Sequence, residues 1–249
     1  MMAITGINWP PPSACLQVGA DEVQVWVVAL DLPANETARL ERLLSGEERQ
    51  RANQFKLPHL RERYTVARAT LRRILGSHLD CDPAILEFEY TPRGKPFLAG
   101  HAAGHLHFNL AHSAELALIA VTQLAPLGVD VEHVRPMPEA LGIAERFFSE
   151  RELEVLQGLA TEARDAAFFS LWTRKEAWLK ATGEGISESL AKVEMAFLPN
   201  ETPRVLAIAG DAGAAADWSL LPLSPTAGFV GALAIPHREV RLKCWRFES

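Results

Sequence analysis

Cysteine is scarce in this chain, and long apolar runs are absent. Its 249 residues include three cysteines, Cys15, Cys81 and Cys244, which lie far apart and show no metal-ligand spacing. An odd number of scattered cysteines predicts free thiols in a reducing, cytoplasmic setting. The longest apolar runs, such as residues 116–121, are far shorter than the roughly 20 residues that a membrane-spanning helix needs.

No leader segment is predicted at the start of the given sequence, and positive charge is not in excess. The first residues, 1–6, lack a basic stretch followed by an apolar core, so no secretory signal is predicted. The net charge of −6 argues against nucleic-acid binding, which needs a basic surface. With 48% hydrophobic and 22% charged residues, the composition is typical of a soluble globular protein with one large domain or two small ones.

Patterns in the first half predict strands on both sides of a long helix. Residues 7–20, which contain three consecutive prolines, are predicted to form an extended arm, and 22–30 alternate as a strand does. Ser45-Gly46-Glu47-Glu48 has the pattern of a capping box, which opens a helix. Apolar residues then recur at helical spacing over 59–79, and short strands are predicted at 86–90, 106–110 and 115–122.

The second half repeats this order of elements. A strand is predicted at 127–132, a capped helix after Ser149, and a longer helix over 164–181 that ends at Gly183 and Gly185. Further strands are predicted at 192–198, 216–222, 227–235 and 239–248. The common order predicts an α+β fold of two similar lobes, 1–124 and 125–249, joined near 122–127. A cleft between two such lobes is a common place for a ligand.

Two carboxylates lie two residues apart in Gly128-Val129-Asp130-Val131-Glu132. On a strand, residues i and i+2 share a face, so Asp130 and Glu132 project together while the valines face the core. Close carboxylates repel each other, and a cation between them relieves the repulsion. A solvated edge strand also explains the pair, because so short a pattern often occurs by chance.

A third carboxylate, Glu176, lies on the long predicted helix within Trp172-Thr-Arg-Lys-Glu-Ala177, and Lys180 follows one turn later. Glu176 and Lys180 can form a surface salt bridge, which contributes only about 0.2–0.5 kcal/mol. Glu176 also follows Trp172 by four residues, which places it near the buried side, where a carboxylate is costly unless paired or bound to a metal. Three acids and a lysine suit Mg²⁺ held against a phosphorylated ligand, and we favour this site because both segments occur together.

Residues 49–73 carry a one-sided cluster of positive charge. Their eight cations stand against one acid, Glu62, which gives a local charge of +7 in a chain of −6. A solvated helical face normally mixes both signs, whereas guanidinium groups grip phosphate in bidentate fashion. The segment is therefore predicted to face an anionic ligand or an acidic docking partner. The cations are Arg49, Arg51, Lys56, Arg61, Arg63, Arg68, Arg72 and Arg73, and the turn Arg93-Gly94-Lys95-Pro96 adds two more.

Polar side chains come after the strand predicted at 106–110, in Phe108-Asn109-Leu110-Ala111-His112-Ser113. His112 is able to donate a hydrogen bond to a phosphate, although a lone histidine is more often structural. His105 and His107 alternate as two zinc ligands on one face of a strand do. No further histidine or cysteine pattern completes such a site, so zinc is not favoured.

Together these segments resemble the 4′-phosphopantetheinyl transferases of the Sfp type. The Trp…Lys-Glu-Ala form is similar to the subgroup in bacteria that serves fatty-acid or polyketide carriers as well as peptide synthetases. The resemblance covers residues from about 45 to 190, and the C-terminal strands carry no matching motif. The matching positions are Arg51, Arg63, Gly94–Pro96, Phe108–Ser113, Gly128–Glu132, Phe147–Ser149, Trp172–Ala177 and Leu179-Lys180.

The resemblance implies two α+β lobes with pseudo-twofold symmetry and coenzyme A in the cleft between them. It implies an enzyme of the holo-[acyl-carrier-protein] synthase type. Such an enzyme moves the phosphopantetheine arm of coenzyme A onto a serine of an apo acyl carrier protein or peptidyl carrier domain, and it releases adenosine 3′,5′-bisphosphate. By motif, Asp130, Glu132 and Glu176 would bind Mg²⁺, or Mn²⁺, while Lys180 would contact the phosphates and assist the leaving group.

The same resemblance assigns the remaining site residues and the partner. Arg51, Arg63, Lys95 and His112 would hold coenzyme A phosphates, together with Lys180 and the metal ligand Asp130, and Glu176 is the candidate general base. The expected carrier is acidic and helical. Phe147 and Phe148 are either interface anchors or core residues. A chain that supplies both lobes of its own cleft need not oligomerise, which favours a monomer.

Two other functions would use the same residues. A Mg²⁺-dependent phosphodiesterase or pyrophosphatase acting on a nucleotide needs the same acids and cations, and it would hydrolyse coenzyme A without any carrier protein. A non-catalytic coenzyme A-binding module would bind coenzyme A tightly without transfer. The presence of all three acids and Lys180 counts against this second alternative.

Overall fold

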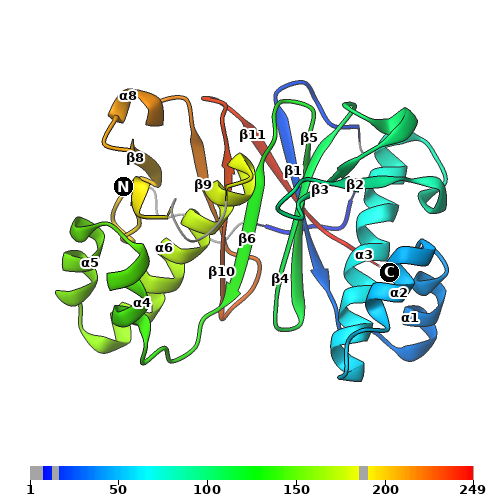
Figure 1. Cartoon of the computed structure of the whole chain (residues 1–249), viewed down its shortest axis with the longest axis horizontal. Coiled ribbons are helices and arrows are strands. Elements are labelled where there is room, and N and C mark those ends of the chain that lie inside the picture. The colour runs from blue at the N-terminus through cyan, green and yellow to red at the C-terminus, as the bar shows by residue number, and fades with distance from the viewer. Residues whose placement is uncertain (1–7, 13–16, 185–189, 249) are drawn as a thin grey trace.

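A computed structural model describes residues 8–12, 17–184 and 190–248 (Figure 1). Cys15, Gly185 and part of the arm predicted over 7–20 lie outside these ranges. The strands are β1 (Glu22–Ala29), β2 (Phe88–Tyr90), β3 (Pro96–Leu98), β4 (His107–Ser113), β5 (Leu116–Thr122), β6 (Gly128–His133), β7 (Val193–Ala196), β8 (Arg204–Ile208), β9 (Ser219–Leu223), β10 (Phe229–Ile235) and β11 (Arg241–Arg246). The helices are α1 (Ala34–Glu41), α2 (Gly46–Ala52), α3 (Pro58–Leu79), α4 (Ala140–Phe147), α5 (Glu150–Gln157), α6 (Thr161–Thr182) and α8 (Ala212–Ala215).

Two main sheets stand back to back in the middle of the molecule, and helices cover their outer faces (Figure 1). The first sheet has the strand order β11-β1-β5-β4 and is covered by α3. The second has the order β6-β10-β9 and is covered by α6. Because each sheet is buried on both faces, its central strands are mostly apolar, as in β5, where every residue is buried and only Thr122 is polar.

Alternate side chains of each central strand belong to two different hydrophobic cores, one between the sheets and one under the covering helix. In β1, Val23, Val25 and Val27 point into the core between the sheets, while Trp26 and Val28 join the core under α3. In β10, Leu233 and Ile235 point between the sheets, whereas Ala232 and Ala234 lie in the core of α6. Successive residues face opposite sides of a strand, so one apolar run fills both layers.

The two halves of the chain share one topology, which confirms the predicted α+β fold with two similar lobes. In the first half β1 pairs with β5 of the hairpin β4-β5, and in the second β6 pairs with β10 of the hairpin β9-β10. A long helix, α3 or α6, stands at the same place in each series. The last strand, β11, returns to the first sheet and pairs with β1 in parallel, with Glu22 opposite Arg241. The division into 1–124 and 125–249 and the pseudo-twofold axis stay predictions.

Helix starts and ends follow the predicted local signals. Ser45 with Glu48 and Ser149 with Glu152 form complete capping boxes, in which each side chain binds the other residue's backbone N–H. Gly183 ends α6 in the left-handed conformation, with φ of 74°. The sequence did not predict the short elements α1, α4, α8, β3 and β8. Neither α1 nor α4 has a side-chain cap, so no local signal marks their starts.

One predicted strand is longer than expected, and the difference changes the site. The strand predicted at 106–110 is β4, which runs from His107 to Ser113. His112 and Ser113, which follow the predicted strand, therefore lie within the observed one, as Asn109 does. Pairing with β5 continues as far as Ser113 opposite Leu116, and this tertiary contact keeps the polar residues extended. Their side chains alternate between the two faces of the first sheet.

Candidate functional site

Helix α6 lies directly on strand β6, and Gly128 makes this approach possible. A Cβ atom at Gly128 would lie 1.9 Å from the carbonyl oxygen of Ala177 and 2.5 Å from the backbone nitrogen of Ala181. Only a residue without a side chain fits between the two backbones. The close packing brings Lys180, on α6, against Asp130, two residues along the strand from the glycine.

Asp130 is buried, and only one of its oxygens has a hydrogen-bond partner. Its Oδ1 accepts a hydrogen bond from Lys180 Nζ at 2.6 Å, while Oδ2 is buried without a partner among the described residues. The pKa of Asp130 is raised to about 6, mainly by burial and less by the negative charges of Glu176 and Glu132, against the opposing effect of Lys180. Such a carboxylate is costly in its charged form unless a further cation approaches.

Glu176 shows the same feature from the helix side. It is half-buried, and its Oε1 has no hydrogen-bond partner within the described ranges. Burial raises the pKa of Glu176, Lys180 opposes that effect, and the charge of Glu132 adds to it. Buried polar atoms in folded proteins are almost always paired. Two unpaired carboxylate oxygens on adjoining elements therefore fit a bound cation with oxygen ligands.

Glu132 is turned toward two other side chains. Its Oε2 accepts a hydrogen bond from Ser113 Oγ at 2.6 Å and lies 3.7 Å from a guanidinium nitrogen of Arg135. In the part of the chain that the structure describes, no three metal-ligating side chains gather closely enough to form a ready metal site. The structure thus brings Asp130 and Glu176 together with Lys180, but it does not show the three-acid cluster that the sequence predicts.

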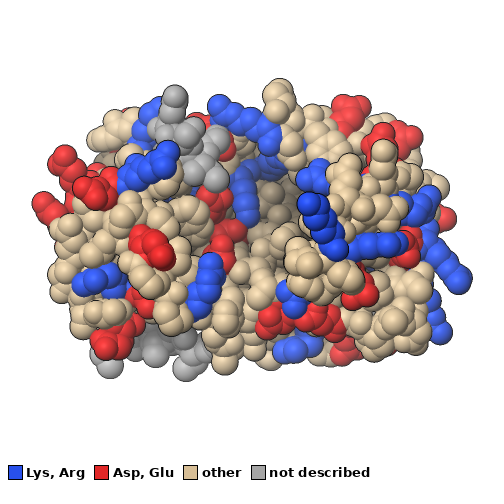
Figure 2. Space-filling view, turned by 60° about the horizontal axis from the view of Figure 1, so that its bottom comes forward, with Lys and Arg blue, Asp and Glu red and all other residues tan. Residues whose placement is uncertain are grey.

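A cavity of about 670 Å³ opens beside these residues and is lined by both halves of the chain. The turn before β3 and the edge strand β4 form one wall, and α6 forms the other with Glu176 and Lys180. Figure 2 shows a hollow near the middle of this face, with basic and acidic residues on its walls. The predicted cleft between the lobes is therefore present.

Two cations of the turn before β3 bind the C-terminal end of α6. Lys95 Nζ donates to the carbonyl oxygens of Leu127 at 3.1 Å, Ala181 at 3.4 Å and Lys180. Arg93 donates to the carbonyl of Gly183 at 3.3 Å. Burial lowers the pKa of Lys95 to about 8. Lys95 thus stands at the cavity wall, but in this structure its amine is bound to two carbonyls near the end of α6 and to the Leu127 carbonyl just before β6.

The other predicted phosphate ligands lie on the first lobe. Arg63 forms a bidentate ion pair with Asp31, at 2.6 and 2.7 Å. The pKa of His112 is lowered by desolvation and by the positive charges of Lys180 and Arg63. His112 therefore lies within the electrostatic reach of cations from both lobes. Arg51, on α2, is exposed and forms no ion pair with any residue in the described ranges.

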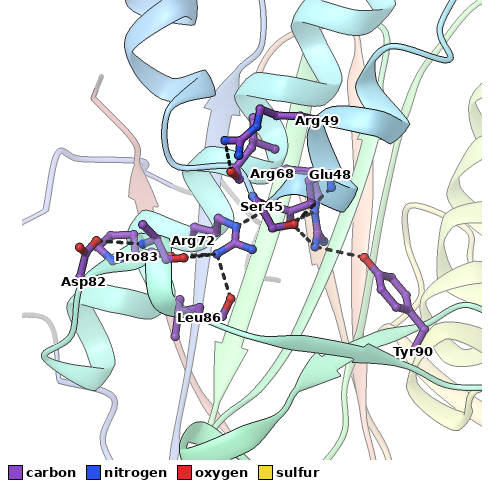
Figure 3. Close-up of polar contacts among 11 residues, drawn as sticks. Ser45, Glu48, Arg49, Arg68, Arg72, Asp82, Pro83, Leu86 and Tyr90 are labelled. Carbon is purple, nitrogen blue, oxygen red and sulfur yellow. Dashed lines mark hydrogen bonds and ion pairs between the residues drawn. The ribbon is translucent and has the colours of Figure 1, made fainter.

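Part of the basic segment is structural, and here the sequence-based prediction is wrong. Arg68 and Arg72 are buried and both bind Glu48, at 2.6 and 2.7 Å, and Arg72 also donates to the carbonyl of Leu86 (Figure 3). These two cations are therefore unavailable to a ligand. The sequence pattern does not show this pairing, because Glu48 lies just outside 49–73, on α2, and contacts α3 only in the folded structure. Asp31 and Glu41, also outside the segment, pair with Arg63 and Arg61.

The second lobe contains a similar buried ion pair between a short helix and a long one. Lys175 is fully buried, pairs with Glu152 at 2.7 Å, and donates to the carbonyls of Leu190 and Val193. Glu48 and Glu152 are both the third residue of a capped short helix, and each neutralises cations of the long helix that follows. Phe148 is buried in this core, which makes it a core residue, whereas Phe147 is partly exposed and packs against the edge of the core.

Sequence reasoning assigned no role to two residues beside the acids. Asn109 Oδ1 accepts the backbone N–H of Val129 at 2.9 Å, and Ser113 Oγ accepts that of His133 at 3.1 Å. They lie four residues apart on one face of β4. That spacing is visible in the sequence, but it carries meaning only if the strand continues to Ser113.

Comparison with known proteins identifies the family to which this geometry belongs. A model described as the 4′-phosphopantetheinyl transferase superfamily matches residues 126–234, and one described as 4′-phosphopantetheinyl transferase, N-terminal, matches 33–124. The chain is 40% identical over 241 residues to the 4′-phosphopantetheinyl transferase HetI of Nostoc sp., with 96% of this chain and 98% of that relative covered. It is 35% identical over 153 residues to psf-1 of Bacillus pumilus, with 61% of this chain and 64% of that relative covered. It is 26% identical over 167 residues to Sfp of Bacillus subtilis, with 66% and 72% covered. The chain therefore belongs to the 4′-phosphopantetheinyl transferase superfamily and is a transferase of the Sfp type.

Proposed function

We propose that this enzyme transfers the 4′-phosphopantetheine group of coenzyme A to a serine of an apo acyl carrier protein or peptidyl carrier domain and releases adenosine 3′,5′-bisphosphate. One observation carries the proposal beyond the family. Two unpaired, buried carboxylate oxygens, of Asp130 and Glu176, stand beside Lys180 where α6 forms a wall of the cavity. This arrangement suits a cation and a phosphorylated ligand together.

The acids are proposed to hold Mg²⁺, and Mn²⁺ has the same preference for oxygen ligands. Asp130 and Glu176 would use the oxygens that lack partners, and Glu132 would add the oxygen that Ser113 does not bind. When bound, Mg²⁺ neutralises phosphate charge and stabilises negative charge on the leaving oxygen. Burial is the main cause of the raised pKa values of Asp130 and Glu176, and repulsion by neighbouring carboxylates adds to it; a bound divalent cation would offset both effects.

The remaining chemistry is positioning and proton transfer by the chain's own residues. In phosphoryl transfer the protein mainly positions the reactants and neutralises charge. The serine oxygen of the carrier forms a bond to the pantetheine-side phosphorus, and the bond from that phosphorus to the bridging oxygen breaks. Glu176, whose pKa is raised by burial, is the proposed acceptor of the serine proton. Lys180 is proposed to contact the phosphates and stabilise the departing oxygen.

Arg51, Arg63, Lys95 and His112 are proposed to bind the phosphates of coenzyme A. Arg63 would exchange Asp31 for phosphate at small cost, because exposed ion pairs contribute only about 0–1 kcal/mol. Lys95 would have to leave the carbonyls of Leu127, Lys180 and Ala181. Lys95→Met therefore tests its role, since loss of a phosphate contact raises KM for coenzyme A, whereas loss of the helix contacts lowers the free energy of unfolding.

The partner is proposed to be an acidic, helical carrier that docks through charge complementarity and apolar contact. Phe55 and Leu57, with exposed fractions of 38% and 52%, lie next to the exposed cation Lys56 and support this choice. We also propose that the enzyme is a monomer that acts in the cytoplasm. Both lobes of one chain line the cavity. None of the helices in the described ranges has the length and apolarity needed to cross a membrane.

The proposal is tested by incubating the enzyme with coenzyme A, Mg²⁺ and a panel of apo carriers, followed by intact-mass measurement of each carrier. The expected result is the mass increase of one phosphopantetheine group on at least one carrier. Asp130→Ala should abolish the transfer, while Glu162→Ala, which removes an exposed acid in the first turn of α6, should leave the rate unchanged. Hydrolysis of coenzyme A without any carrier would refute the transferase proposal, and transfer by Asp130→Ala at the parental rate would refute the metal assignment.

A further inference from the structure

Side chains of β4 bridge the two sheets at the site. Strand β4 ends the order of the first sheet and β6 ends that of the second. Asn109 Oδ1 accepts the N–H of Val129 at 2.9 Å, and Ser113 Oγ accepts the N–H of His133 at 3.1 Å. A strand of one lobe is thus fastened to a strand of the other by two side-chain hydrogen bonds.

These two hydrogen bonds enclose the acidic segment. Asn109 and Ser113 are four residues apart on one face of β4, and their partners Val129 and His133 are four residues apart on β6. The equal spacing means that the two strands run in the same direction here, about 13 Å between the two bonds at the usual rise of a strand. Asp130 and Glu132 lie between the two fastened positions.

Ser113 makes a second contact that involves the acid itself. Its hydroxyl proton is donated to Glu132 Oε2 at 2.6 Å while its oxygen accepts the N–H of His133. A hydroxyl has one proton and two lone pairs, so both functions are compatible. A hydrogen bond to an ionised carboxylate is short and roughly twice as strong as a neutral one. This hydrogen bond therefore restricts the rotation of the Glu132 side chain.

We infer that Asn109 and Ser113 are positioning residues that fix the acidic strand for metal binding, and that Ser113 sets the orientation of the Glu132 carboxylate. This inference rests on the proposed function. Without the Ser113 hydroxyl, the neighbour left to Glu132 Oε2 is the exposed guanidinium of Arg135, at 3.7 Å. Glu132 would then have to be ordered each time that Mg²⁺ binds, which weakens the affinity. Loss of such an outer partner typically lowers metal affinity 10- to 100-fold.

The test is a calorimetric titration of Mg²⁺ into the full-length enzyme without coenzyme A. Ser113→Ala is expected to weaken Mg²⁺ binding by about 10- to 100-fold. Ser113→Thr, which keeps the hydroxyl, is expected to restore affinity close to the parental value. Thr122→Val is the matched control, because the buried Thr122 hydroxyl also donates one hydrogen bond, to the Glu22 carbonyl, and accepts one, from the N–H of Leu124, yet does not contact the acids. It should leave the affinity unchanged.

Amide hydrogen exchange gives a reading that is independent of metal. Exchange at His133 is expected to accelerate in Ser113→Ala while exchange at Val129 stays slow, because Asn109 still holds it. If Ser113→Ala does not fold, Ser113→Cys serves the same purpose, since a thiol of similar size is a weak donor.

Three outcomes would overturn the inference. The first is Mg²⁺ binding by Ser113→Ala as tight as that of the parent enzyme. The second is a loss of affinity in Thr122→Val as large as that in Ser113→Ala, which would indicate a general loss of stability. In both cases the metal site itself would stand. Failure of the parent enzyme to bind Mg²⁺ is a different result, and it would refute the metal part of the proposed function together with this inference.

Discussion

Gly128→Ala is the change that most directly tests how the fold builds the site. The added Cβ would lie 1.9 Å from the Ala177 carbonyl oxygen, about 1.1 Å inside the 3.0 Å below which real Cβ contacts are essentially never seen. Both nearest atoms belong to the backbone of α6, so no side-chain rotation relieves the clash and the helix must move by about 1 Å. Overpacking of this kind typically costs about 1–3 kcal/mol, and we expect the upper end because backbone meets backbone.

The movement should affect catalysis as well as stability. Displacement of α6 carries Glu176 and Lys180 away from Asp130, and a misplacement of about 1 Å can lower a rate about 100-fold. Urea unfolding measures the first effect and the carrier-transfer assay the second. Gly142→Ala is the control, because no atom lies within 4 Å of its Cβ position and alanine is the better helix former in α4. A Gly128→Ala enzyme with parental stability and rate would refute the reasoning.

Three further predictions follow from the charges. Mg²⁺ affinity should fall as the pH drops below about 6, because the pKa of Asp130 is raised to about 6, mainly by burial, and protons then compete with the metal. Calorimetric titrations between about pH 5 and 8 measure this affinity, and a constant affinity would contradict the prediction. Glu48→Gln should lower the free energy of unfolding by about 3–5 kcal/mol, because two buried guanidinium groups lose their counter-ion, whereas the exposed neighbour Glu47→Gln should change it by about 0.5 kcal/mol or less in urea unfolding. Lys180→Met should reduce kcat by on the order of 100-fold or more, because it removes a positive charge beside the leaving oxygen, and a near-parental kcat would exclude the role proposed for Lys180.

Local patterns predicted the elements whose causes are local. The capping boxes at Ser45 and Ser149 and the helix end at Gly183 depend on contacts within a few residues, and each lies where the sequence placed it. The end of β4 was predicted wrongly because its last residues are polar. Pairing with β5 keeps these residues extended. The side chains of Asn109 and Ser113 hydrogen-bond to β6 of the other sheet, so they do not show the alternation of apolar and polar residues by which a strand is predicted.

Chemically similar cations show where sequence reasoning stops. Lys175 and Lys180 are five residues apart on one helix, yet Lys175 is buried against Glu152 while Lys180 stands at the cavity against Asp130. In the same way, Arg68 and Arg72 look like phosphate ligands in the sequence and are bound to Glu48 in the structure. The sequence shows which charges exist, but their partners come from segments that are distant along the chain.

The sequence by itself determined the family resemblance, the two-lobed α+β order and the candidate residues for metal and phosphate binding, because residue type and short spacing decide these. Only the tertiary structure decided that β11 returns to β1, that Gly128 lets α6 rest on β6, and that Glu132 is bound to Ser113. Burial and charge pairing depend on distances in space, and those distances are set by how sheets and helices pack rather than by spacing along the chain.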